Sequence, residues 1–486
     1  MLCSPIWRSQ QAMKAEEYAS LDALGVAALI ESKAVSPTEV VEAAIDICER
    51  RNPEINAVSY EAFDHARSMA LEPTTIPSGP FGGVPFLLKE IRGDIPGWPD
   101  RMGCKAMAEN VSTTSTELVK RHLATGVIPM GKTTSPEFGA IAVTESDLYG
   151  DTRNPWNLAH TPGGSSGGAA AAVAAGIAPI AHANDGAGSI RIPASCCGLV
   201  GMKPSRGRMP QGPDAEIGAG LGIEHVVTKS LRDTAAMLDA THGDMVGAPY
   251  SAPTPASSFG EALQRPPGQV KIAYWTKYWT SGEPTHPECV LAVENTAKLL
   301  AEMGQHLDEA RPDFDYQALQ AAFMKLWVTF SAVAVDQITD NPTTELFEQY
   351  TLDLANLGCN ISAAEFVAAH DHVMQLGWLC GDFHADYDLL VTTTLGCPPI
   401  KIGAWRRDSL FADVQVQQEF MLSSGVANAT GQPAISLPLH IKADGLPVGV
   451  MSTAAYGRED LLLSVAAELE RAAPWAITTP RCLGVI

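Results

Sequence analysis

The sequence predicts an α/β protein, because helical and strand-like segments alternate along it and apolar residues are abundant. Of its 486 residues, 46% are hydrophobic, which supports a large buried core. Residues 82–89 and 127–131 are short apolar runs typical of buried strands, and residues 115–125 between them have a helical pattern. This order favours two parallel strands joined by a crossover helix.

The other elements have comparable local signals. Residues 36–39 (SPTE) form a capping box with proline at the first helical position, and Val41, Ala44, Ile45 and Cys48 then recur on one helix face. Residues 247–268, rich in Pro, Ser and Gly, predict a surface connection. The remaining predicted strands are 270–275, 386–396 and 434–439, and the remaining predicted helices are the Ala-rich run 169–181, a capped helix from Ser230 with Ala236, Met237 and Ala240 buried, 287–303 and 319–338.

Residues 163–203 carry the most specific pattern in the chain. Two clusters of glycine and serine, 163–168 (GGSSGG) and 186–189 (GAGS), flank a run of Ala, Val, Ile and Gly. Glycine loses more entropy on folding than other residues, so its density here indicates backbone shapes that side chains forbid. We expect the two clusters to lie side by side and to present serine hydroxyls and backbone N–H groups to a reacting carbonyl group.

One alternative is the nucleophile elbow of α/β-hydrolases, because residues 164–168 match G-x-S-x-G with Ser166 as nucleophile. That elbow follows a strand, whereas residues 154–164 are a loop rich in Pro and Gly. It also needs an acid and then a histidine, and none of the 12 histidines has a telling context. A flexible linker fits less well still, since linkers are not fused to long apolar runs.

Without a histidine, a serine hydrolase needs another base, and Lys89 is the candidate. It ends the apolar segment 82–88, and burial lowers the pKa of a lysine because desolvation disfavours the ammonium form. The ordinary alternative is a lysine that reaches solvent from a strand end.

Lys89, Ser165 and Ser189, in this order and spacing, resemble the catalytic residues of the amidase signature family. The resemblance extends over nearly the whole chain, and residues 182–195 and 454–470 are most similar to nylon-oligomer amidases, a group whose relatives cleave carbamates. The other motifs that carry it are NPEINAV (52–58), GKTTSPEF (131–138), TRNPW (152–156), GLVGMKPSRGR (198–208), GQPAISLP, GLPVGV and YGREDLLL.

The resemblance implies a Ser–cis-Ser–Lys triad. Ser189 is then the nucleophile, Ser165 follows a cis peptide after Gly164 and relays the proton, and Lys89 is the base that returns it to the leaving amine. The oxyanion hole is expected from the N–H groups of Gly186, Ala187, Gly188 and Ser189, with support from Ser166, Asp185 and Arg191. Many members of the family have Thr-Gly-Gly before the nucleophile; here Ala187 keeps its N–H, and only a hydroxyl at position 186 is lost.

The resemblance also implies one domain over residues 1–486, with an α/β/α core around a large mixed sheet flanked by helices on both sides. The core is expected at 60–245 and 386–475, and a variable, mainly helical substrate-side region at about 270–385. The substrate pocket, largely apolar, is expected from 205–228 with a mobile lid at 212–222, the helix at 323–330, and 396–412, where Trp405, Arg406 and Arg407 line an entrance or cap the surface.

Charge and cysteine usage limit the partners. A net charge of −22 argues against binding to nucleic acids or anionic membranes, and the Ala-rich run is too short to span a bilayer.

Ten scattered cysteines without a CxxC pair indicate free thiols, with Cys196 and Cys197 packed behind the nucleophile loop. His370 and His372 lie too far apart around a helix to share a metal ion. Residues 1–20 lack an apolar signal pattern, so we expect a cytoplasmic protein. We further expect a monomer or homodimer that uses no metal and no cofactor.

The expected function is therefore a serine hydrolase that cleaves C–N bonds of small amides, either nylon-type oligoamides or aryl amides, and of carbamates. Two alternatives stay open: the glutaminase subunit of a tRNA-dependent amidotransferase, and an esterase-like promiscuous hydrolase. Release of ammonia from glutamine only with a partner subunit would favour the first alternative.

Overall fold

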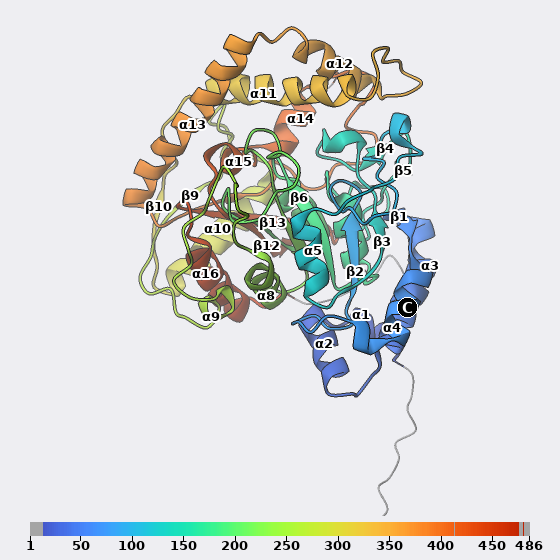
Figure 1. The fold of residues 1–486 in the computed structure, drawn as a ribbon. Helices are drawn as coiled ribbons and strands as arrows, with labels where there is room; N and C mark the ends of the chain where they lie inside the picture. The colour runs from blue at the N-terminus through green and yellow to red at the C-terminus, as the bar shows by residue number, and fades with distance from the viewer. Residues whose placement is uncertain (1–12, 413, 476–479, 481–486) are drawn as a thin grey trace, which may run out of the picture.

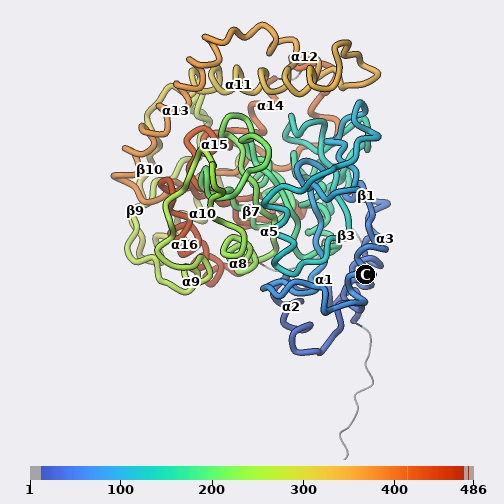
Figure 2. Tube along the Cα trace, viewed as in Figure 1, coloured from blue at the N-terminus to red at the C-terminus, as the bar shows by residue number. Residues whose placement is uncertain are grey.

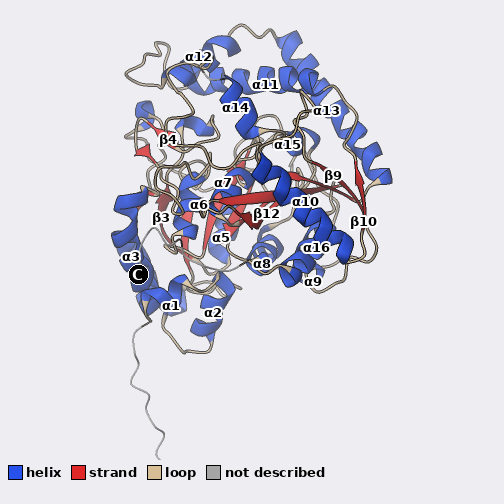
Figure 3. Ribbon diagram, turned by 180° about the vertical axis from the view of Figure 1, so that it is seen from behind, coloured by secondary structure: helices blue, strands red, loops and turns tan. Residues whose placement is uncertain are grey.

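A mixed β-sheet of 11 strands runs through the protein, with helices on both sides (Figures 1 and 3). The computed structural model describes residues 13–412, 414–475 and 480. The expectations for residues 1–12, Cys3 and Cys482 lie outside this part. In spatial order the strands are β1 (Val58–Glu61), β3 (Ile128–Thr133), β2 (Pro85–Lys89), β6 (Ile180–Asp185), β8 (Ile223–Thr228), β7 (Val200–Lys203), β12 (Ala434–Ile441), β13 (Pro447–Ala454), β11 (Leu389–Thr393), β9 (Lys271–Trp275) and β10 (His306–Glu309).

The strand directions confirm the mixed α/β fold. Strands β3, β2 and β6 are parallel neighbours, as are β11, β9 and β10, and the other pairs in the sheet are antiparallel. The predicted crossover is present, since α5 (Glu117–Ala124) connects the parallel strands β2 and β3. A separate small sheet pairs β4 (Glu145–Ser146) with β5 (Gly150–Asp151).

Alternation along β7 shows how the sheet separates two hydrophobic cores. A Cβ at Gly201 would lie 2.5 Å from Ala194 of α7, whereas Val200 and Met202 point into the other core. The first core includes helices α1 (Ala15–Ala19), α2 (Ala23–Glu31), α3 (Pro37–Ile55), α4 (Phe63–Leu71), α6 (Gly167–Ala174) and α7 (Arg191–Cys197). The second includes α8 (Leu231–Thr241), α9 (Phe259–Ala262), α10 (Pro287–Glu302) and α16 (Glu459–Ala472).

A helical layer covers one end of the molecule, opposite the N-terminal helices α1 and α2 (Figure 2). It consists of α11 (Tyr316–Asp336), α12 (Gln349–Gly358) and α13 (Ala363–Asp386), and α14 (Val414–Met421) and α15 (Val426–Thr430) lie beneath it. Among the described residues, α11 alone is long and apolar enough to span a membrane by length and composition, with a mean hydropathy of 1.5. This criterion is weak for a single helix, and α11 packs along α12 and α13.

Most local predictions are confirmed, but the predicted helix 169–181 is shorter, because α6 ends at Ala174 and β6 begins at Ile180. Helix α3 has its capping box at Ser36. The predicted connection 247–268 contains the short helix α9, because the Ser258 hydroxyl caps it and Phe259 enters the second core. On α8, Met237 is buried as predicted, but Ala236 is only half-buried and Ala240 is exposed. The buried face of α8 contains Leu231, Ala235 and Leu238 instead.

One predicted pocket segment and the predicted helical region also differ from expectation. Within 205–228, residues 223–228 form the buried central strand β8 rather than a loop. The region 270–385, predicted as mainly helical, contains the predicted strand β9 and also β10, and both extend the main sheet. It therefore contributes to the core as well as to the helical layer. The limits of the single domain stay a prediction.

Candidate active site

The GGSSGG segment meets the GAGS loop because the chain doubles back between them. Helix α6 begins at Gly167, directly after the serines, and β6 returns the chain to Asp185, directly before the loop. The Ser166 N–H donates to the Ser189 carbonyl at 3.3 Å and joins the two segments. A Cβ at Gly164 would lie 2.6 Å from the Val143 carbonyl oxygen, and one at Gly168 would lie 2.5 Å from a backbone oxygen. The glycines are therefore required by close packing, as their density predicted.

Lys89 is fully buried at the end of β2 and contacts Ser165. Its Nζ lies 2.7 Å from Ser165 Oγ, and Ser165 follows a cis peptide bond from Gly164, as the resemblance implied. Burial lowers the pKa of Lys89 to about 7, although the carboxylates of Asp185 and Glu224 oppose that shift. A large fraction of this amine is neutral near physiological pH and able to accept a proton.

Ser189 lies at the turn between β6 and α7. The residue is 8% exposed, and its hydroxyl has no hydrogen-bond partner within the described residues. The structure therefore joins Lys89 to Ser165 through side chains, and joins Ser189 to this pair through the main chain at Ser166. The Ser166 hydroxyl donates to the Asn184 carbonyl at 3.2 Å, so it fixes the backbone beside Lys89.

A buried ion pair fixes the loop that carries Ser189. The guanidinium of Arg191 donates to both carboxylate oxygens of Asp185 at 2.9 and 3.0 Å, so these two supporting residues pair across the loop. Burial by itself raises the pKa of Asp185, but the Arg191 charge outweighs that effect and lowers the pKa to about 2. Asp185 is consequently an anion at neutral pH.

The predicted oxyanion hole needs one correction. The Gly188 N–H donates to Asp185 Oδ1 at 2.6 Å and is engaged within the loop, so it is not available to an oxyanion in this geometry. In the described part of the chain, the N–H groups of Gly186, Ala187 and Ser189 make no hydrogen bond. Among the described residues, three of the four predicted donors therefore have no acceptor that would compete with an oxyanion.

Sequence reasoning missed three polar residues that hold the site. Asn428 on α15 donates to the Asp185 carbonyl at 2.8 Å and accepts from Arg191, and the Ser424 hydroxyl donates to the Ala187 carbonyl at 2.6 Å. The third is Asn184, which accepts a hydrogen bond from Lys89 Nζ. Asn184 stands next to Asp185 in the motif, which is a signal that could have found it; Ser424 and Asn428 lie more than 200 residues away in a segment without a motif.

Two aromatic side chains of α11 lie next to the nucleophile loop. Phe323 and Trp327 stack with ring centroids 5.9 Å apart. A Cβ at Gly186 would lie 3.2 Å from the Trp327 ring, and one at Gly425 would lie 3.6 Å from Phe323 and 3.9 Å from Ala187. The predicted contribution of residues 323–330 to the surroundings of the nucleophile is thus present as an aromatic wall.

The segment 396–412 does not place Trp405 at an entrance. Trp405 is 2% exposed, because it packs into the first hydrophobic core, and it lines a cleft with Arg407, Glu145 and Glu348. Arg407 pairs with Glu348 at 2.8 Å, so this cleft is an ion-pair region beside the small sheet β4–β5. The backbone of 400–402 nevertheless touches the loop before GGSSGG, since the Thr161 N–H donates to the Ile400 carbonyl.

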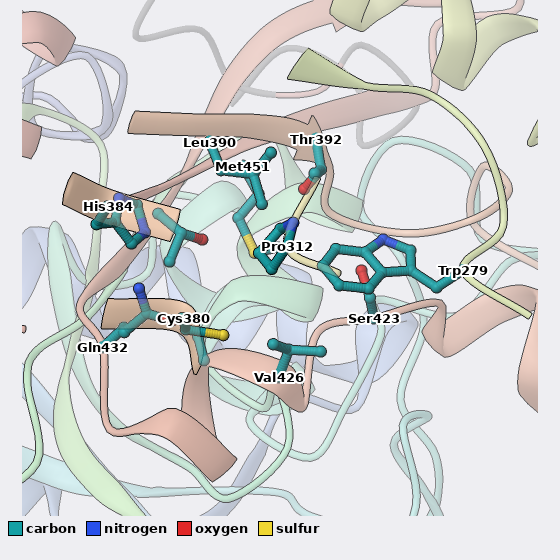
Figure 4. A pocket seen from close by; sticks show the side chains of 12 residues that line it. Trp279, Pro312, Cys380, His384, Leu390, Thr392, Ser423, Val426, Gln432 and Met451 are labelled. Carbon is teal, nitrogen blue, oxygen red and sulfur yellow. The ribbon is translucent and has the colours of Figure 1, made fainter. Parts of the chain in front are cut away.

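A small cavity lies beside the start of α15 (Figure 4). Its volume is about 20 Å³, close to that of one or two water-sized spheres, which is too small for an amide substrate. Residues around it include Trp279, Thr392, Ser423, Val426 and Met451. This cavity is therefore not the substrate pocket.

The cysteines and histidines singled out in the sequence lie on α7 and α13. Cys196 and Cys197 are buried on α7, directly behind the nucleophile loop, as predicted. His370 and His372 lie on α13. Over residues 13–412, 414–475 and 480, no group of three or more His, Cys, Asp or Glu side chains is arranged to hold a metal ion.

The fold and the glycine–serine site together define an amidase-type α/β protein. A family model described as Amidase matches residues 39–463, so the chain belongs to the amidase family. The 6-aminohexanoate-cyclic-dimer hydrolase of Paenarthrobacter ureafaciens is 37% identical over 95% of this chain and 97% of its own length. An acylamidase of Rhodococcus erythropolis is 32% identical over 95% of this chain and 97% of its own.

A solved structure of 6-aminohexanoate cyclic dimer hydrolase superimposes with a TM-score of 0.90 and is 36% identical, covering 96% of this chain and 99% of the solved one. The family and these relatives identify the protein as a hydrolase of carbon–nitrogen bonds related to nylon-oligomer hydrolases and acylamidases.

Proposed function

We propose that the protein hydrolyses small amides and carbamates through an acyl-enzyme on Ser189, with Ser165 as proton relay and Lys89 as general base. The observation that carries this proposal is the buried Lys89 amine 2.7 Å from Ser165 Oγ, with a pKa lowered by burial to about 7. A base with a pKa near the working pH is well suited to proton transfer.

In the proposed reaction, Ser189 Oγ attacks the substrate carbonyl carbon while its proton passes to Ser165, whose own proton passes to Lys89. The N–H groups of Gly186, Ala187 and Ser189 stabilise the oxyanion; loss of one such donor typically lowers the rate by about 10²–10³. The Lys89 ammonium then returns its proton through Ser165 to the leaving amine, which breaks the C–N bond. Water attacks the acyl-enzyme by the same route and regenerates Ser189.

The same steps apply to carbamates. Departure of the amine leaves an alkoxycarbonyl group on Ser189, and its hydrolysis releases a carbonic half-ester that decomposes to an alcohol and CO₂. The stacked side chains of Phe323 and Trp327 favour substrates with a flat or apolar group next to the carbonyl, including aryl amides and aryl carbamates. We also propose that the hydrolase acts on free small molecules, in the cytoplasm, without a cofactor.

A substrate panel tests the proposed function. One amide, one carbamate and one ester with matched groups next to the carbonyl, together with glutamine, are assayed with the wild type and the Ser189→Ala variant. We expect turnover of the amide and the carbamate by the wild type and loss of both in the variant. Turnover of glutamine alone, or of the ester alone, would replace this proposal by one of the two alternatives from the sequence.

A further inference from the structure

Asn184, the second-last residue of β6, binds the same amine as Ser165. Its Oδ1 accepts a hydrogen bond from Lys89 Nζ, and its Nδ2 donates to the Ile91 carbonyl at 3.1 Å. A carbonyl oxygen can only accept, so the contact with Ile91 fixes the Asn184 amide with its oxygen toward Lys89. The Ser166 hydroxyl, which donates to the Asn184 carbonyl, fixes the backbone at the same residue.

This contact limits how the neutral amine is oriented. A neutral lysine has two N–H bonds and one lone pair, and the amide oxygen of Asn184 requires one of those N–H bonds. The lone pair is thereby excluded from the direction of Asn184, and one of the two directions left is that of Ser165. We propose that Asn184 is a positioning residue that turns the lone pair of Lys89 toward the Ser165 hydroxyl. The inference rests on the proposed role of Lys89 as base.

The neutral charge of Asn184 matters as much as its geometry. The charged and titratable groups facing Lys89 include Asp185 and His182 on β6 and Glu224 on β8, and the carboxylates are acted on in turn by Arg191, Lys203 and Arg92. Each of the two carboxylates is paired with an arginine at 2.8 or 2.9 Å. Asn184 supplies a hydrogen-bond acceptor without adding a third, unpaired carboxylate, which would stabilise the ammonium form of Lys89.

The pH profile of kcat/KM for Asn184→Asp and Asn184→Leu tests this role. In Asn184→Asp, an anion beside Lys89 raises the pKa of the base. We therefore expect the acid limb of kcat/KM to move to higher pH by about one unit or more, which lowers kcat/KM roughly tenfold at pH values below the limb. In Asn184→Leu, we expect kcat to fall about tenfold with KM unchanged and the acid limb at or below its original pH. The matched control is Asn154→Asp, a buried carboxamide that bonds the carbonyls of Thr161 and Cys196.

Two results would overturn the inference. The first is an acid limb of Asn184→Asp at the same pH as those of the wild type and of Asn154→Asp. The second is a kcat of Asn184→Leu equal to that of the wild type, and this result tests the role even when the Asp variant does not fold. The Lys89→Ala variant separates this inference from the proposed function. If Lys89→Ala is inactive while both Asn184 variants behave as wild type, only the role of Asn184 is wrong; if Lys89→Ala is active, the proposed function itself is wrong.

Discussion

The Gly188 N–H donates to the Asp185 carboxylate at 2.6 Å, which ties the residue before the nucleophile to a buried ion pair. Asp185 is held in turn by Arg191, and both side chains are inaccessible to solvent. The loop geometry that exposes the remaining N–H groups therefore depends on charge pairing within six residues of chain. This relationship explains why Asp185 and Arg191 matter although neither has a place in the proposed chemistry.

Arg191→Met should destabilise the fold and lower activity together. Removal of one partner leaves Asp185 as an unpaired buried anion, which costs about 3–5 kcal/mol. Urea unfolding should show this decrease in the free energy of unfolding. A stability within about 1 kcal/mol of the wild type would contradict the assigned role of the pair.

The activity should have an acid limb near pH 7. Only the neutral amine of Lys89 accepts a proton, and its pKa is lowered by burial to about 7. Activity is thus fully present above that pH and falls about tenfold per unit below it. The measurement is kcat/KM between about pH 5 and pH 9; a limb near pH 4, typical of a carboxylate, would point to another base.

Ser424→Ala should lower kcat about tenfold while leaving KM nearly unchanged, because its hydroxyl anchors the Ala187 carbonyl at 2.6 Å and so orients the oxyanion donors. The matched control is Ser464→Ala on α16, whose hydroxyl also donates to a main-chain carbonyl but lies outside the site. Equal activity of the two variants would show that the Ser424 hydroxyl does not orient the loop.

Trp327→Ala should raise KM about tenfold for an amide whose acyl group carries an aryl ring, since the aromatic wall is expected to contact the acyl group. The effect on KM for an acetyl amide should be smaller. Trp378→Ala on α13 is the control, because Trp378 is exposed to solvent. Steady-state kinetics with the two substrates decides the matter. A uniform effect on both substrates would place the acyl group elsewhere.

The sequence predicted the parts of the site that are encoded locally. Glycine density marked the two clusters, the apolar run before Lys89 marked a buried strand, and Asp185 and Arg191 flank the predicted nucleophile loop. Parallel pairing of β2 and β3 followed from their order with α5. Each of these properties depends on residues that are near one another in the chain.

The remaining parts depend on tertiary contacts that leave no local pattern. Ser424 and Asn428 reach the loop from a segment without a motif, and the burial of Trp405 follows from packing against the first core. The engagement of Gly188 by Asp185 could not be read from spacing, since it depends on the backbone turn with φ of 127° at Gly188. Long-range packing therefore decided the details of the oxyanion hole and of the pocket.

Mass spectrometry after reaction with a fluorophosphonate tests the central claim most directly. We predict a single label, localised by fragmentation to Ser189, in the wild type, and labelling slowed by at least about a hundredfold in Lys89→Ala, because the nucleophile then lacks its base. Label on Ser166 would support the nucleophile-elbow alternative instead. Labelling of Lys89→Ala at the wild-type rate would contradict the account.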